Sequence, residues 1–203
     1  MDKLNVEQLV IEQVKNGTIN ENNVKDCSFQ IREILASNGL LLSALVKDEE
    51  PRIRELVAKQ GYGLETLVND KNKSVRLQVA YQGYGFEKLI DDEYYLIRRV
   101  IAKRGYGLER LIYDTDVTVK LAVLDKGYGF DIAMNNNPEF EIKKFMLERG
   151  LYLDRLLYDE YYLIRKMLAN RGYFLDTLKN DEDARVRDSA IIKLEELKNK
   201  EEL

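Results

Sequence analysis

A dipeptide made of a β-branched residue and a cation recurs along this chain at an almost constant spacing. Successive copies are 22 residues apart except for one step of 23, and a glycine follows each of the first seven by eight residues. The copies are Ile31-Arg32, Ile53-Arg54, Val75-Arg76, Ile97-Arg98, Val119-Lys120, Ile142-Lys143, Ile164-Arg165 and Val186-Arg187. A fixed period of this length is typical of stacked units that are each too small to bury an apolar face alone. The spacing therefore predicts an elongated domain without an internal linker.

Each repeated unit is expected to contain two helices. In residues 70–90, Val75 and Val79 lie on one face of a helix, which would form the core. Gly83 follows where a helix needs a residue at positive φ, so the first helix should end there in a Schellman cap. A second apolar stripe over residues 86–90 covers only about two turns. The predicted fold class is an all-α solenoid with one α-helix and one short α or 3₁₀ helix per repeat.

The two ends of the chain depart from the repeat as terminal caps do. Residues 1–22 form a degenerate unit that we interpret as an N-terminal cap. Residues 23–180 hold seven repeats. Residues 181–203 run on without the glycine into a polar end, which is typical of a C-terminal capping helix. Residues 1–203 are therefore interpreted as a single domain.

An acidic residue stands six residues before most of the repeated cations. These acids are Asp48, Asp70, Asp92, Asp114, Asp159 and Asp181. At the 23-residue step, Asn136 or Asn137 takes the place of the acid. An acid at the head of a helix can accept hydrogen bonds from backbone N–H groups and can pair with cations along the stack. We expect a structural ladder between repeats, and a row of acids that faces a ligand is the alternative.

Composition argues against several classes of function. The chain has no histidine and only one cysteine, Cys27, so it lacks the commonest general base and the residues of a cysteine-rich metal site. No phosphate-binding loop occurs, and we expect no catalytic residue, no cofactor and no metal. The net charge of −4 disfavours nucleic acid, although a local basic stripe could exist. The longest nearly apolar run, Leu40 to Val46, is too short to span a membrane, and the start has no leader pattern. We expect a cytoplasmic monomer.

The repeated pattern resembles that of HEAT-like repeats, and more closely the leucine-rich repeat variant, whose units pair an α-helix with a short 3₁₀ helix. The resemblance rests on the acid and the Val-Arg pair, as in Asp70 with Val75-Arg76, and it covers about residues 23–194. Here Gly-Tyr-Gly stands where the variant usually has an Asn-Pro turn, and the unit is slightly short. Some variant proteins hold an iron–sulfur centre, which a single cysteine does not imply. The resemblance implies a right-handed superhelix that offers a surface to partners.

Two irregularities are the candidate partner-binding features. The segment 92–98 recurs letter for letter as 159–165, and each copy contains a pair of tyrosines. These candidates are Tyr94, Tyr95, Tyr161 and Tyr162. Either a recent duplication of three repeats copied the segment, or the tyrosines bind a partner, a role for which tyrosine is well suited. In addition, Tyr152 and Phe174 replace the second glycine of Gly-Tyr-Gly, which indicates a bend or a second binding site.

The sequence thus favours a non-enzymatic protein–protein interaction scaffold that binds a partner on its solenoid surface. A narrower form of this expectation is an inhibitor from a phage or mobile element that blocks a host defence protein. The alternative is a HEAT-like nucleic-acid-binding protein related to alkylpurine DNA glycosylases, which the acidic charge and the lack of tryptophan disfavour. Fold alone does not decide between these functions.

Overall fold

The structure, a computed structural model, describes residues 3–136 and 138–201, and every regular element within these ranges is a helix. The all-α prediction is confirmed. The chain divides into two compact units between Tyr128 and Gly129. The interpretation as a cap, seven repeats and a capping helix in one domain stays a prediction.

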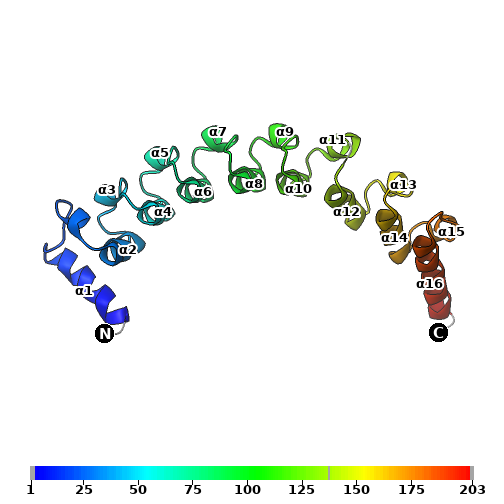
Figure 1. The fold of residues 1–203 in the computed structure, drawn as a ribbon, viewed down its shortest axis with the longest axis horizontal. Coiled ribbons are helices and arrows are strands. Elements are labelled where there is room, and N and C mark those ends of the chain that lie inside the picture. Colours follow the sequence, from blue (N-terminus) through cyan, green and yellow to red (C-terminus); the bar gives the residue numbers. More distant parts are fainter. Residues whose placement is uncertain (1–2, 137, 202–203) are drawn as a thin grey trace. The chain divides into compact units, whose positions relative to one another are not determined.

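The first unit contains two rows of helices (Figure 1). After α1 (Lys3–Lys15) and η1 (Val24–Asp26), one row consists of nine-residue helices that each pack against the next: α2 (Phe29–Ser37), α4 (Pro51–Lys59), α6 (Lys73–Tyr81), α8 (Tyr95–Lys103) and α10 (Val117–Asp125). The other row consists of four-residue helices: α3 (Leu42–Leu45), α5 (Leu64–Leu67), α7 (Phe86–Leu89) and α9 (Leu108–Leu111). The short element of each pair is therefore a single α-helical turn.

The second unit alternates in the same way. Its elements are α11 (Phe130–Asn135), α12 (Phe140–Glu148), α13 (Leu153–Leu156), α14 (Tyr162–Asn170), α15 (Leu175–Leu178) and α16 (Ala184–Glu201). At the 23-residue step, Asn136 follows α11 as its C-cap, and Asn137 lies outside the described residues.

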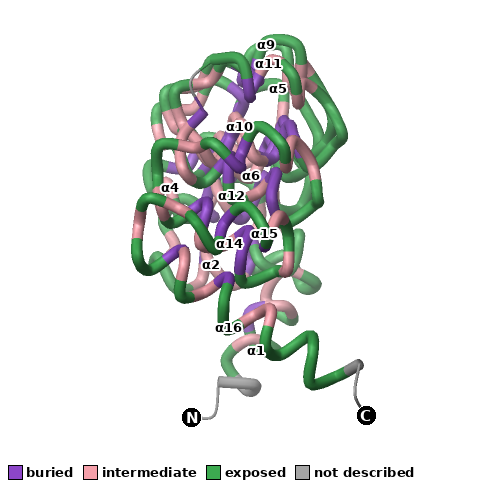
Figure 2. Tube along the Cα trace, turned by 90° about the vertical axis from the view of Figure 1, so that its right-hand side faces the viewer, coloured by how far each residue is buried: buried purple, intermediate pink, exposed green. Residues whose placement is uncertain are grey.

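The core of each unit lies between its two rows, where Figure 2 shows the buried positions gathered inside the chain trace. In the first unit, Val75, Val79 and Ala80 of α6 are fully buried and Leu89 of α7 is nearly so. These residues are the apolar faces that the sequence predicts for the two helices. Burial of such stripes supplies most of the stability of short helices, because helices of one or two turns are unstable in isolation.

The predicted glycine caps are confirmed. Gly83 has a φ of 81°, and its N–H donates to the Ala80 carbonyl at 3.0 Å. The next N–H, of Tyr84, donates to the Val79 carbonyl at 3.3 Å, which completes a Schellman motif. A left-handed residue is needed at this position, and glycine adopts it without strain.

The second glycine of Gly-Tyr-Gly is also left-handed, which the sequence analysis did not predict. Gly85 has a φ of 68° and is the N-cap of α7. A Cβ at Gly85 would overlap the Val68 side chain of the preceding short helix. Glycine here therefore leaves room for the Val68 side chain to pack against the start of α7.

Candidate functional site

The N-terminal ends of the nine-residue helices are joined by a ladder of ion pairs. Arg54 of α4 donates from Nε and Nη2 to both carboxylate oxygens of Asp70, at 2.6 and 3.0 Å. Its Nη1 donates to the carbonyl of Asp48, at 2.6 Å, in the loop that precedes its own helix. The acid that pairs with each cation thus belongs to the next repeat, 16 residues later. The equivalent pairs are Arg32–Asp48, Arg76–Asp92, Arg98–Asp114, Lys143–Asp159 and Arg165–Asp181.

The ladder is buried. The side chains of Arg54 and Asp70 are 9% and 7% exposed. Burial alone would raise the pKa of Asp70, but hydrogen bonds from Arg54 and from the backbone N–H of Asn72 outweigh burial and lower that pKa. Because both partners are enclosed and fully bonded, the geometry favours the structural interpretation of the acids over a row that faces a ligand.

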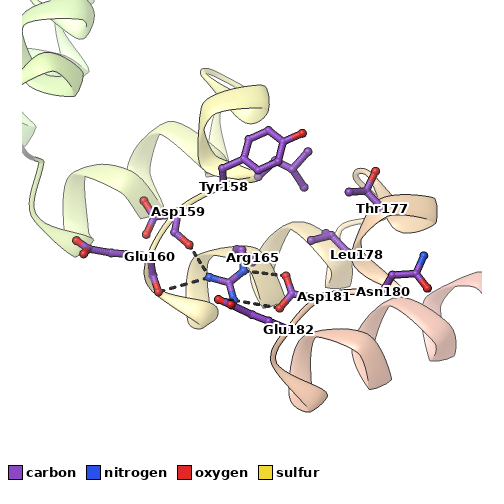
Figure 3. Close-up of a pocket in the computed structure, with 10 residues that line it drawn as sticks. Tyr158, Asp159, Glu160, Arg165, Thr177, Leu178, Asn180, Asp181 and Glu182 are labelled. Carbon is purple, nitrogen blue, oxygen red and sulfur yellow. Dashed lines mark hydrogen bonds and ion pairs between the residues drawn. The ribbon is translucent and has the colours of Figure 1, made fainter.

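Shallow depressions lie beside the ladder in both units. In the second unit, a depression of about 400 Å³ is lined by Tyr158, Arg165, Asp181 and neighbouring loop residues (Figure 3). Figure 3 shows the Arg165 guanidinium between the Asp181 carboxylate and the backbone carbonyls of the loop before α14, at 2.8 Å from Asp181 Oδ2. In the first unit, Arg98 borders an equivalent depression of about 360 Å³. The charged walls are already bonded to one another, so they offer few free groups to a small ligand.

The tyrosine pair of the first unit lies at the start of α8. Tyr94 is the N-cap and Tyr95 is the first helical residue, with ring centroids 5.7 Å apart in an edge-to-face arrangement. Lys73 places its ammonium 4.5 Å from the centroid of the Tyr94 ring. Tyr95 is 37% exposed and Tyr94 is half-buried. The pair therefore presents aromatic surface to solvent.

The identical pair of the second unit has different neighbours. Tyr161 is 49% exposed, and one face of its ring covers the buried Lys143 ammonium at 4.6 Å. Tyr162 is half-buried under the guanidinium of Arg185, which lies 3.5 Å from the ring centroid. Tyr161 thus also helps to enclose a buried cation, whereas Tyr94 contacts an exposed lysine.

Both N-cap tyrosines occupy a position where a polar cap would be preferred. At the same position, Asn72 accepts a hydrogen bond from the N–H of Ser74 at 2.8 Å, and Asp116 accepts one from Thr118 at 2.9 Å. Tyr94 and Tyr161 make no such bond. The N–H of each tyrosine donates to the ladder acid two residues earlier, as the N–H groups of Asn72 and Asp116 also do, so the ladder does not replace the missing cap. Glu50 and Glu139 also make no side-chain cap bond, but each carries a carboxylate near the helix N-terminus. The sequence alone does not reveal this conflict, because it does not fix the first residue of each helix.

The two other candidates are held within the second unit. Tyr152 and Phe174 are left-handed, with φ of 55° and 53°, so they keep the backbone of the glycine that they replace. The Tyr152 hydroxyl donates to Asp131. Burial and this carboxylate raise the pKa of Tyr152 to about 12. The Tyr152 hydroxyl is therefore engaged within the chain. Whether this region binds a partner or produces a bend stays a prediction.

The C-terminal ends of the nine-residue helices are also bridged, by contacts that the sequence analysis missed. Gln60 and Gln82, each the C-cap of its helix, donate from Nε2 to the last carbonyl of the preceding helix, at 2.7 and 3.0 Å. Arg104 donates in the same way to the Tyr81 carbonyl at 2.8 Å. A cation at this position would be expected to complement the carbonyl end of its own helix, but this guanidinium donates to the last carbonyl of the neighbouring one. The recurrence of a long polar residue just before the glycine was the available signal.

Neither a metal site nor a membrane helix is found in the part of the chain that the structure describes. No three acidic or cysteine side chains there lie close enough together to hold a metal ion. No helix among the described residues is both long enough and apolar enough to cross a bilayer. Cys27 is half-buried, and burial followed by the charge of Asp26 raises the pKa of its thiol. A raised thiol pKa disfavours a reactive thiolate.

Comparisons with known proteins add no family. No protein-family model matches the chain, and a search of curated proteins finds no significant sequence relative.

Proposed function

We propose that this chain is a non-enzymatic scaffold that binds a protein partner through the tyrosines at the starts of α8 and α14. The single observation that carries the proposal is a tyrosine at each of these N-caps, where Asn72 and Asp116 make the expected hydrogen bond. Replacing a polar N-cap by a residue without the cap bond costs about 1 kcal/mol. A fold that accepts this cost twice, at half-exposed or exposed aromatic residues, is consistent with selection for binding.

Tyrosine is suited to this role because it buries a large area at low entropic cost and keeps a hydroxyl for hydrogen bonding. The neighbours of the first-unit pair support the same role. Tyr95 is exposed, and the Tyr94 ring contacts the ammonium of Lys73. Because the Lys73 side chain is itself exposed, it can move away from the ring at a small cost in free energy. The first-unit pair is therefore the stronger anchor of the proposed site, and the second-unit pair combines binding with enclosure of Lys143.

The proposal includes the finer architecture. We infer that the 22-residue repeats form an α-solenoid of the HEAT-like or leucine-rich-repeat-variant kind, a right-handed superhelix, in a protein that works in the cytoplasm. The bridges at both ends of neighbouring nine-residue helices support this inference, because a solenoid repeat contacts its sequence neighbours through equivalent residues. Such a stack presents the same helix positions in series along one surface, as a partner-binding scaffold requires.

The experiment is capture of a protein partner from a lysate of the source cell. The full chain is immobilised as wild type and as a variant with Tyr94, Tyr95, Tyr161 and Tyr162 changed to alanine. The control changes four exposed tyrosines, those of the Gly-Tyr-Gly turns: Tyr62, Tyr84, Tyr106 and Tyr128. We expect the first variant to lose the partner at unchanged helical circular dichroism and the control to keep it.

Equal capture by both variants would contradict the proposed site. If the wild type captured DNA or RNA with a steep dependence on salt, and no protein, the scaffold proposal would give way to nucleic-acid binding, because phosphate contacts release counterions.

A sharper variant separates binding from folding. Tyr94→Asn restores the polar N-cap seen at Asn72, so it should raise the free energy of unfolding by up to about 1 kcal/mol. It should at the same time weaken partner capture, because the aromatic anchor is lost. Urea denaturation followed by circular dichroism measures the first effect, and the capture assay measures the second. A variant that is less stable than the wild type would show that Tyr94 serves the fold.

A further inference from the structure

On the exposed side of the nine-residue helices in the first unit, α6, α8 and α10 carry different residues from α2 and α4. The second, fifth and ninth residues of each helix share one side, because they are three and four residues apart. Bridges at both ends join α6 to α8, and a ladder pair joins α8 to α10, so these helices pack in the same direction with equivalent residues beside one another. We define the α8 face as these residues of α6, α8 and α10: Ser74, Leu77, Tyr81, Leu96, Arg99, Lys103, Thr118, Leu121 and Asp125.

The centre of the α8 face is apolar and open to solvent. Leu77, Leu96 and Leu121 come from three successive helices, and each remains partly exposed. Tyr81 beside them is 49% exposed, and Tyr95 at the start of α8 is 37% exposed. Partly exposed apolar side chains that recur on one face of successive helices are typical of interaction surfaces.

Two cations lie within this apolar surface. Arg99 and Lys103 make no hydrogen bond or ion pair with any residue that the structure describes. The acid of the face, Asp125, takes part in an interaction of its own. The face therefore combines half-buried leucines with two positive charges that are not neutralised by a hydrogen-bonded partner.

The same positions of α2 and α4 are a built-in contrast. There Arg52 lies 3.4 Å from Glu33 of the neighbouring helix and 3.2 Å from Glu55 of its own helix. These charges neutralise one another, and the exposed positions carry no leucine. The exposed side of α2 and α4 therefore lacks both the unpaired cations and the leucines of the α8 face, so a partner that binds the α8 face should not bind there.

We propose that the α8 face binds an acidic amphipathic helix of a protein partner, an inference that rests on the proposed scaffold function. Apolar residues on one side of such a helix would cover Leu77, Leu96 and Leu121, and its carboxylates would pair with Arg99 and Lys103. Nucleic acid fits less well, because two cations among leucines offer few phosphate contacts and the chain carries a net charge of −4.

The test uses three labelled peptides of about 18 residues, or about five helical turns. The first carries leucines on one helix face and glutamates elsewhere, the second replaces the glutamates by lysines, and the third scrambles the first. Fluorescence anisotropy with the full chain measures affinity. We expect the first peptide to bind at least about tenfold more tightly than the other two. Equal binding of the scrambled peptide, or no binding of the first, would overturn the proposal.

Matched variants then locate the site. Arg99→Glu with Lys103→Glu should weaken binding of the acidic peptide at least about tenfold. The control, Lys59→Glu, changes the same helix position in α4 and should alter affinity by less than about twofold. All of these residues are half-buried or exposed, so the helical circular dichroism should be unchanged. A loss of similar size in the control would show a general charge effect and overturn the assignment to the α8 face.

Two further arms separate the alternatives. If an oligothymidine of about 20 nucleotides bound more tightly than the acidic peptide and was lost in the double variant, the face would be a nucleic-acid site instead. If the Arg99→Glu, Lys103→Glu variant still captured a cellular protein and the wild type bound no peptide, the scaffold proposal would stand. The assignment of binding to the α8 face would then be wrong. If the chain captured no cellular protein but bound the acidic peptide specifically, the proposal of a scaffold anchored by the tyrosines would be wrong. The proposal for the α8 face would stand.

Discussion

The two ends of the nine-residue helices are joined to their neighbours by different chemistry. At the N-terminal end, Arg54 and Asp70 form a charged pair that is almost completely buried. At the C-terminal end, the exposed side chain of Gln82 donates one neutral hydrogen bond to the Lys59 carbonyl. Both contacts link one repeat to the next and recur along the first unit. Because breaking a buried charged pair costs more than losing an exposed neutral hydrogen bond, we expect the N-terminal contact to stabilise neighbouring repeats more than the C-terminal one does.

The largest expected effect comes from breaking a buried pair. Asp70→Ala leaves the Arg54 guanidinium enclosed without its carboxylate, which should lower the free energy of unfolding by about 3 kcal/mol. The control Glu55→Gln weakens a pair with Arg52 that solvent reaches and should cost less than about 0.5 kcal/mol. Urea denaturation measures both. Equal costs would show that burial does not distinguish the two kinds of pair.

Acid should titrate the same pairs. The hydrogen bond from Arg165 lowers the pKa of Asp181, and hydrogen bonds outweigh burial to lower the pKa of Asp70. Because both carboxyls titrate below the unfolded value of about 3.9, their contribution is complete above that pH and is lost as the pH falls through the folded pKa. We therefore expect the urea midpoint to be steady between about pH 5 and 7 and to fall steeply below about pH 4. A midpoint that falls already between about pH 6 and 5 would assign acid sensitivity to other groups.

At the C-terminal end, the two glycines of one turn should differ. Gly83→Ala adds a Cβ in open space at a φ of 81°, so only backbone strain of about 1 kcal/mol is expected. Gly85→Ala adds the same strain and an overlap with Val68, so about 2 to 3 kcal/mol is expected. Thermal and urea unfolding of the two variants give the difference. Equal costs would mean that Val68 moves aside freely.

Sequence reasoning reached the fold class and the caps because both depend on local patterns. The stripe of Val75 and Val79 and the glycine at position 83 require only helical periodicity and positive φ. It also predicted a ladder, but not its register. Asp70 lies six residues before Arg76 and 16 after Arg54, and only the packed helices show that its side chain pairs with Arg54.

The candidate site was only partly accessible to sequence reasoning. The repeated segment drew attention to Tyr94 and Tyr161, but identical letters cannot reveal that one ring contacts an exposed lysine and the other covers a buried one. That difference comes from residues about one repeat earlier, Lys73 and Lys143. The unpaired charge of Arg99 was inaccessible for the same reason, because it depends on which helices pack side by side.

The smallest expected effect tests the weaker end of the comparison. Gln82→Ala removes the exposed amide that caps the Lys59 carbonyl, and water can replace that hydrogen bond, so about 0.5 kcal/mol is expected. Arg104→Ala, which removes the equivalent bond to Tyr81, should cost a similar amount. Urea denaturation of the two variants beside Asp70→Ala compares the ends directly. If Gln82→Ala cost as much as Asp70→Ala, the C-terminal bridges would hold neighbouring repeats together as strongly as the buried pairs do. Burial would then not explain any difference in strength between the two ends.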